Sequence, residues 1–158
     1  MQRPHAELWL MLAASMPERR RFADAVAALD REGLIQRHAD VIQARDEIRM
    51  KWDGPYIDAE IGHLSEDSTE DLADWIVGQG HAYWARARGA DDPTLAAMFA
   101  EYAAERRGAP GRWDGRTPPM GPSFHASNHA RFPDEEEHED LLDAVHTELR
   151  ASGADDDT

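Results

Sequence analysis

The segment SEDSTEDLADWIVGQGHAYW, residues 65–84, decides the fold class of this chain. It opens on a serine, whose hydroxyl oxygen can accept an N–H group of a first helical turn. Four of the next six residues are acidic, which suits the positive end of a helix. Apolar side chains then recur on one face at helical spacing: Leu72, Trp75, Ile76, Tyr83 and, just beyond, Ala87. The segment predicts a long amphipathic helix that Ser65 caps.

Two glycines lie inside this predicted helix. Gly78 and Gly80 each cost about 1 kcal/mol relative to alanine in a helix interior. Two such costs in three residues predict that another part of the molecule approaches the backbone closely there.

The rest of the chain carries similar helical patterns. We expect a short helix over residues 7–15, a second ending at Gly33, and a third over residues 34–52. Further helices are predicted over residues 56–61 and 92–107. No segment shows the alternation of a β-strand. The predicted fold is an all-α irregular bundle of five to seven helices, with a Pro/Gly-rich arm and an acidic C-terminal helix.

Composition divides the chain into four parts. Residues 1–107 form the predicted helical domain. Residues 108–133 hold five prolines and four glycines, which is typical of a linker or an arm wrapped on the body. Residues 134–151 return to an amphipathic helix, and residues 152–158 are an expected disordered tail. Four apolar side chains are candidates to pin the arm to the surface: Trp113, Met120, Phe124 and Phe132.

Negative charge is concentrated at the C-terminus. The chain has 17 basic and 32 acidic residues, a net charge of −15. Residues 134–158 hold 11 acidic residues and one basic residue, so −10 of the net charge lies there. Acidic tails of this kind solvate a protein or bind partners. Because phosphate contacts need a basic patch, we expect no direct binding to nucleic acid.

The compartment follows from what the sequence lacks. The chain has no cysteine, which excludes disulfides, thiolate nucleophiles and iron–sulfur clusters. The apolar run near the N-terminus is only seven residues long, too short for a secretory signal. No run approaches the roughly 20 apolar residues of a membrane span. We expect a soluble cytoplasmic protein with no membrane attachment.

Residues 7–99 resemble a bacterial domain-of-unknown-function family, number 4240. The resemblance depends on a set of motifs that recur in that family in the same order. Here they are Trp52-Asp53, Ser65-Glu66-Asp67, Leu72, Trp75-Ile76-Val77, Gly80, and Asp92-Pro93 followed by Leu95. The chain departs from the pattern at Thr69, where an aromatic is expected, and at Ala73, where an arginine is expected. The resemblance implies an α-helical bacterial domain and implies no activity.

Acidic residues crowd the start of the predicted central helix. Asp67 and Asp71 are four residues apart and share a helix face. With His63 and His81 on either side, they are the candidate metal ligands, since carboxylates and imidazoles are common ligands. The alternative is a solvated helix start that the helix dipole stabilises, by about 0.3–1 kcal/mol per charge.

Two polar residues fall on the apolar stripe of the third helix, His38 and Arg45. One hypothesis is a network of these residues with an acid from residues 58–74, lining a groove between the third and central helices. An unpartnered buried arginine would be strongly unfavourable, which is why an acid is needed. The alternative is that both side chains reach solvent along their stems.

Four tryptophans lie on predicted helices and are expected in the core: Trp9, Trp52, Trp75 and Trp84. An aromatic surface beside acids can also bind a cation. The candidate binding residues are therefore His38, Arg45, Trp52, Asp53, Asp67, Asp71 and Trp75.

Catalytic signatures are missing from the sequence. It has no HExxH, phosphate loop, G-x-S-x-G or dinucleotide fingerprint. The leading hypothesis is a non-enzymatic acidic domain that needs no cofactor and binds a basic protein partner. The alternative is a small metal-binding protein, or a metal-dependent enzyme, using residues 65–71.

Overall fold

The computed structural model describes residues 4–115, 124, 127–128 and 130–153. Within these residues the chain folds into eight α-helices and one 3₁₀ turn, with no β-strand, which confirms the all-α prediction. The elements are α1 (Ala6–Ser15), α2 (Arg19–Ala27), α3 (Arg31–Arg49), η1 (Met50–Trp52), α4 (Pro55–Ile61), α5 (Glu66–Gly78), α6 (His81–Arg88), α7 (Asp92–Arg106) and α9 (Glu135–Gly153).

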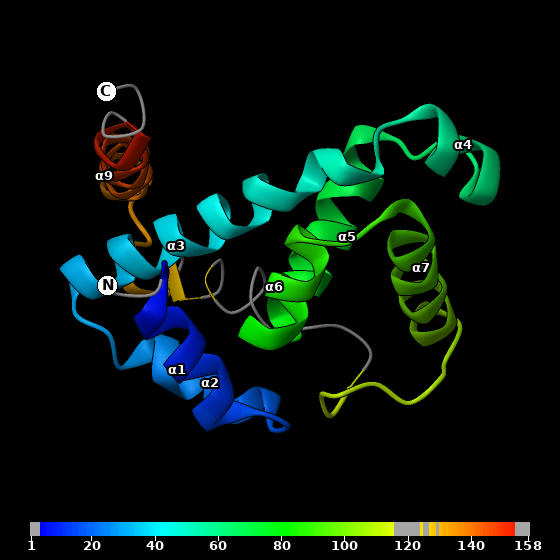
Figure 1. The fold of residues 1–158 in the computed structure, drawn as a ribbon. Coiled ribbons are helices and arrows are strands. Elements are labelled where there is room, and N and C mark those ends of the chain that lie inside the picture. Colours follow the sequence, from blue (N-terminus) through cyan, green and yellow to red (C-terminus); the bar gives the residue numbers. More distant parts are fainter. Residues whose placement is uncertain (1–3, 116–123, 125–126, 129, 154–158) are drawn as a thin grey trace.

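The long helix α3 runs across the molecule, and other helices pack along it (Figure 1). The main partners of α3 are α5 and α9, while α1 and α6 also contact it. Away from α3, α1 packs on α2 and α4 packs on α7. Figure 1 shows α9 beside the N-terminal half of α3 and α4 near the opposite end of the molecule. One apolar core joins all of these helices.

The helix starts follow from capping residues. Asp30 caps α3, because its carboxylate accepts the N–H of Gly33 at 2.7 Å. Ser65 caps α5 as predicted, with its hydroxyl oxygen 3.1 Å from the Ser68 nitrogen. The expectation that Gly33 ends the second helix is wrong, since α2 ends at Ala27 and Gly33 lies in the first turn of α3. The aspartate cap decides this boundary.

The predicted central helix is two helices, α5 and α6. The break lies at Gly80, whose φ of 96° belongs to the left-handed region that glycine adopts most easily. A Cβ built on Gly80 would meet only the Met16 methyl group, at 3.9 Å. Close approach is therefore the wrong explanation for Gly80. At Gly78 the indole of Trp113 does approach the backbone, since it donates to the Gly78 carbonyl at 2.8 Å.

All four helical tryptophans are in the core, as expected. Trp9 and Trp84 pack together with ring centroids 5.0 Å apart. Their indole N–H groups donate to backbone carbonyls, of Pro4 and Ala44 respectively, so no buried indole donor is left over here. The Trp84 bond joins α6 to α3, whereas the Trp9 bond is local to the start of α1.

The arm is attached to the body where it is described. Trp113 and Phe124 are buried, Phe132 is half-buried against the core, and Met120 lies outside the described residues. Arg112 also donates to the Gln79 carbonyl at 3.1 Å. Together with Trp113, it satisfies carbonyl groups at the C-terminal end of α5, which a helix otherwise leaves without partners.

The acidic C-terminal helix is present as α9, and residues 152–153 extend it beyond the predicted end. The remainder of the expected tail, residues 154–158, lies outside the described residues. Among the described helices, none combines the length and apolar character that crossing a membrane requires.

Candidate functional site

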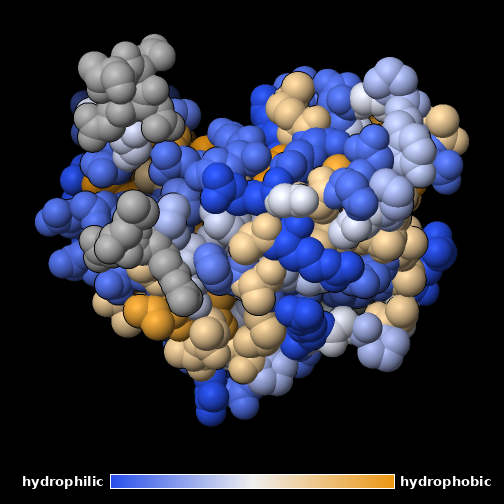
Figure 2. Space-filling model, in the orientation of Figure 1, coloured by the Kyte–Doolittle hydropathy of each residue, from blue (hydrophilic) through white to orange (hydrophobic). Residues whose placement is uncertain are grey.

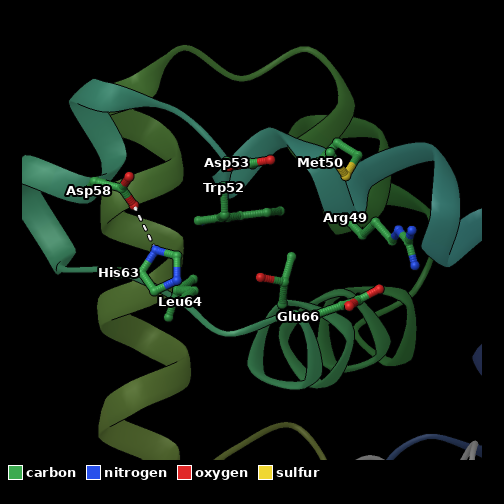
Figure 3. Close-up of a pocket in the computed structure, with 9 residues that line it drawn as sticks. Arg49, Met50, Trp52, Asp53, Asp58, His63, Leu64 and Glu66 are labelled. Carbon is green, nitrogen blue, oxygen red and sulfur yellow. Dashed lines mark ion pairs between the residues drawn. The ribbon is translucent and has the colours of Figure 1, made fainter.

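A cavity of about 330 Å³ opens where the end of α3, η1, α4 and the start of α5 meet (Figure 3). This volume is at the lower end of the range for ligand sites. The cavity is lined by Arg49, Met50, Trp52, Asp53, Asp58, His63, Leu64, Glu66 and Thr69.

Local sequence explains why the chain turns around this cavity. Extended backbone at Gly54, followed by Pro55 in the first turn, ends η1 and starts α4. After α4, the cap at Ser65 starts α5 on the other side of the cavity. Trp52 lies between them, 1% exposed, with its indole nitrogen 3.4 Å from the Leu95 carbonyl oxygen on α7. An anchored aromatic ring thus forms part of the cavity wall.

Negative charge dominates the cavity rim. Asp53, Asp58 and Glu66 are all exposed. Of the two basic residues, His63 lies 4.0 Å from Asp58, and Arg49 pairs with Glu70 on α5 at 3.2 Å. Figure 3 shows the Asp58–His63 pair and Arg49 on opposite sides of Trp52. Since Arg49 already has an acidic partner, the rim has a surplus of carboxylates and suits a cation.

Some predicted binding residues meet at this cavity and others do not. Trp52 and Asp53 line it. Asp67 and Asp71 are exposed on α5 outside the cavity, and Asp71 lies 3.9 Å from Arg106. Trp75 is buried on the α7 side of α5, where it contacts Tyr102. The acidic pair is thus part of a solvated helix surface, as the alternative interpretation expected.

The predicted metal ligands do not converge. His63 is exposed beside α4, whereas His81 packs against Trp9 and Trp84 at the far end of α5. Since α5 has 13 residues at 1.5 Å rise each, its length of about 20 Å separates Asp67 from His81. The described part of the chain holds no group of three acids or histidines that could bind a metal ion. The geometry gives no support to the metal hypothesis.

The predicted network of His38 and Arg45 is divided between two interfaces. His38 stacks on Phe124, with ring centroids 5.4 Å apart, on the side of α3 that α9 covers. Arg45 pairs with Asp46 at 3.4 Å, and its charge also acts on Asp74 of α5. Burial raises the pKa of Asp74 to about 6, while Arg45 opposes the rise. Arg45 therefore has acidic neighbours, and His38 does not share them.

Replacing Arg45 with glutamine tests these two electrostatic contacts. The positive charge of Arg45 lowers the pKa of both Asp74 and His38. We therefore expect both pKa values to rise in the variant, measured by NMR titration of the carboxyl carbon and the imidazole protons. An unchanged pKa at either group would show that Arg45 does not act on it. Arg49→Gln, which removes a different arginine of α3, is the matched control.

A second network was not found from the sequence. The side chain of His5 is 5% exposed, and its ring nitrogens lie 3.1 Å from Asp40 and 3.1 Å from Glu47 of α3. Burial alone would lower the pKa of His5, but these hydrogen bonds and charges outweigh it and raise the pKa to about 9. Glu47 also pairs with Arg88 of α6 at 3.3 Å. The acids seven residues apart on α3 are the only sequence signal of this network.

A larger cavity, about 800 Å³, lies between α1 and the start of α6. Its walls include Trp9, Leu10, Met16 and His81, and Leu10 is 64% exposed. Figure 2 shows apolar surface in the lower part of the molecule, where α1 lies. Because the described residues of its walls include no carboxylate, this cavity differs in kind from the acidic cavity beside Trp52.

Comparison with known proteins finds no relative of this chain. No family model, curated protein or solved structure matches the chain.

Proposed function

We propose that the chain is a non-enzymatic interaction domain that binds a basic segment of a protein partner at the acidic cavity beside Trp52. The observation that supports this proposal is the combination of an apolar wall with a carboxylate rim. Met50 and Leu64 provide apolar surface at the cavity, beside the buried ring of Trp52, and Asp53, Asp58 and Glu66 provide the charge. Lysine and arginine side chains have the matching form, an apolar stem that ends in a cation.

The surroundings of the cavity favour a protein partner. Met50 at its edge is 60% exposed, and Tyr56 on α4 is 43% exposed. Exposed methionine and tyrosine are common in protein interfaces. The net charge of −15 would also speed encounter with a basic partner and make binding sensitive to salt. The resemblance to the bacterial family number 4240 stays a prediction and assigns no other role.

An array of lysine- and arginine-rich peptides, followed by fluorescence anisotropy on the tightest binder, tests the proposal. We expect the triple variant Asp53→Asn/Asp58→Asn/Glu66→Gln to weaken binding about tenfold, because three exposed charge pairs contribute about 0.5 kcal/mol each. We also expect the affinity of the unmodified protein to fall as salt is raised.

A matched triple variant on α9 separates the cavity from overall charge. Glu135→Gln/Glu136→Gln/Glu139→Gln removes the same three charges from exposed positions away from the cavity. We expect it to change the affinity less than about twofold. Equal losses in the two triple variants, or no peptide binding at all, would contradict the proposal. A metal ion retained at one per chain after dialysis would favour the metal-binding alternative.

A further inference from the structure

The face of α9 that packs on α3 combines a few apolar residues with histidines. Leu141 and Val145 are fully buried there, and Leu149 is partly buried. His138 lies one turn before Leu141, and His146 directly follows Val145, so both histidines are on or beside the packing face. The rest of α9 is largely acidic and exposed. The interface therefore depends on a narrow apolar stripe.

His38, which is half-buried, is the residue of α3 on which His138 and His146 of α9 act electrostatically. Its ring stacks on Phe124 at an interplanar angle of 22°, and its Nδ1 is buried with no hydrogen-bond partner in the described part of the chain. The charged and titratable groups that act on it are Arg45 on α3 and His138 and His146 on α9. Each of these lowers the pKa of His38, and no acid from the described part of the chain is among them.

We propose that the α3–α9 interface is a pH-sensitive latch, closed while His38 is neutral and opened on acidification, when the imidazole, whose Nδ1 is buried without a hydrogen-bond partner among the described residues, binds a proton. A protonated His38 in the closed interface would carry an N–H at Nδ1 with no acceptor among the described residues, near the positive charge of Arg45. When α9 moves away, Nδ1 reaches water and α9 exposes its apolar stripe. The device is independent of the acidic cavity, which lies toward the other end of α3.

The size of the effect follows from proton linkage. Burial, followed by the charges of Arg45, His146 and His138, lowers the pKa of His38 to about 4. In the open form the imidazole has its ordinary pKa, about 6.5. The open form therefore binds the proton more tightly, and stability of the closed form is lost as pH falls from 6.5 toward 4. Between pH 7.5 and pH 5.0, the ratio of open to closed forms should rise about 30-fold.

Hydrogen–deuterium exchange of the full chain at pH 7.5 and pH 5.0, corrected for intrinsic exchange rates, tests the latch. We expect protection of the α9 amides to fall about 30-fold at the lower pH. At pH 5.0 the α9 amides should also be less protected than those of α5, because α9 opens while the rest stays folded. Equal protection of α9 and α5 at pH 5.0 would mean unfolding of the whole chain and would overturn the proposal.

Variants of His38 identify the proton acceptor. His38→Phe keeps a planar ring against Phe124 but binds no proton, so the pH response of α9 should disappear. His38→Gln is a second neutral variant for use if the first does not fold. His63→Gln removes a histidine that is 86% exposed and should leave the response intact. A 30-fold fall that persists in the His38 variants would also overturn the proposal.

Discussion

Replacing Trp75 with alanine is expected to lower the free energy of unfolding by about 3–5 kcal/mol, the usual cost of removing a buried tryptophan. Trp75 is 5% exposed and joins three helices. Its ring meets Tyr83 of α6 and Tyr102 of α7 edge-on, each at 5.5 Å between centroids. Its indole N–H donates to the carboxylate of Glu105 at 3.0 Å. Urea denaturation followed by circular dichroism measures the loss.

Replacing Trp75 with phenylalanine separates the hydrogen bond from the packing. Glu105 is 7% exposed, and its second carboxylate oxygen has no hydrogen-bond partner among the described residues. Gly111 of the arm lies directly over this carboxylate, so closely that a Cβ at that position would collide with it. In the Trp75→Phe variant the indole donor is absent, so both carboxylate oxygens of Glu105 are buried without a hydrogen-bond partner. We expect a loss of about 2 kcal/mol, since a hydrogen bond to a charged group contributes about 1.5–3 kcal/mol.

A double-mutant cycle checks this explanation. In a Glu105→Leu background the carboxylate is absent, so Trp75→Phe should cost much less than in the unmodified protein. The same cost in both backgrounds would show that the indole–carboxylate bond contributes nothing. Tyr83→Phe removes a different hydrogen bond to a carboxylate, the 2.7 Å bond to Glu101, and is the control for a bond that is only partly buried.

Raising the pH from 6 to about 10 is expected to destabilise the folded chain by about 3 kcal/mol through His5 alone. The pKa of His5 is about 9 in the folded chain and about 6.5 when unfolded. A raised pKa means that the folded state holds the proton more tightly. Its contribution is therefore fully present below pH 6.5 and is lost as pH rises through 9. A difference of about 2.5 pKa units corresponds to about 3 kcal/mol.

Urea denaturation at a series of pH values, with His5→Gln as the control, measures this contribution. Glutamine can donate one hydrogen bond to Asp40 or Glu47 but carries no charge, so the alkaline fall in stability should be smaller by about 3 kcal/mol. Parallel curves for the two proteins would rule out a protonated His5. The His38 latch acts in the opposite direction, below pH 6.5, so the two effects do not overlap.

Local features of the sequence were sufficient for the fold class and most helix starts. A serine before an acidic turn predicts the start of α5, because capping involves residues at most three positions apart. The predicted start at residue 92 also matches α7, although its cap, Asp91, appears only in the structure. The helical tryptophans were assigned to the core on spacing alone, and all are buried. The sequence does not predict the break between α5 and α6, because the spacing of the apolar residues continues across Gly80.

Only the tertiary structure decided the contacts between segments that are distant in the sequence. His5 meets acids 35 and 42 residues later, and Trp75 meets Glu105 after 30 residues. His38 is half-buried, and the ring stacked on it is that of Phe124, from a much later part of the chain. The sequence by itself determined the helices, the apolar faces and the surplus of acids, since these depend on neighbours along the chain. Which acids are paired, buried or free to meet a partner depends on how the helices pack, because charge and burial act through space.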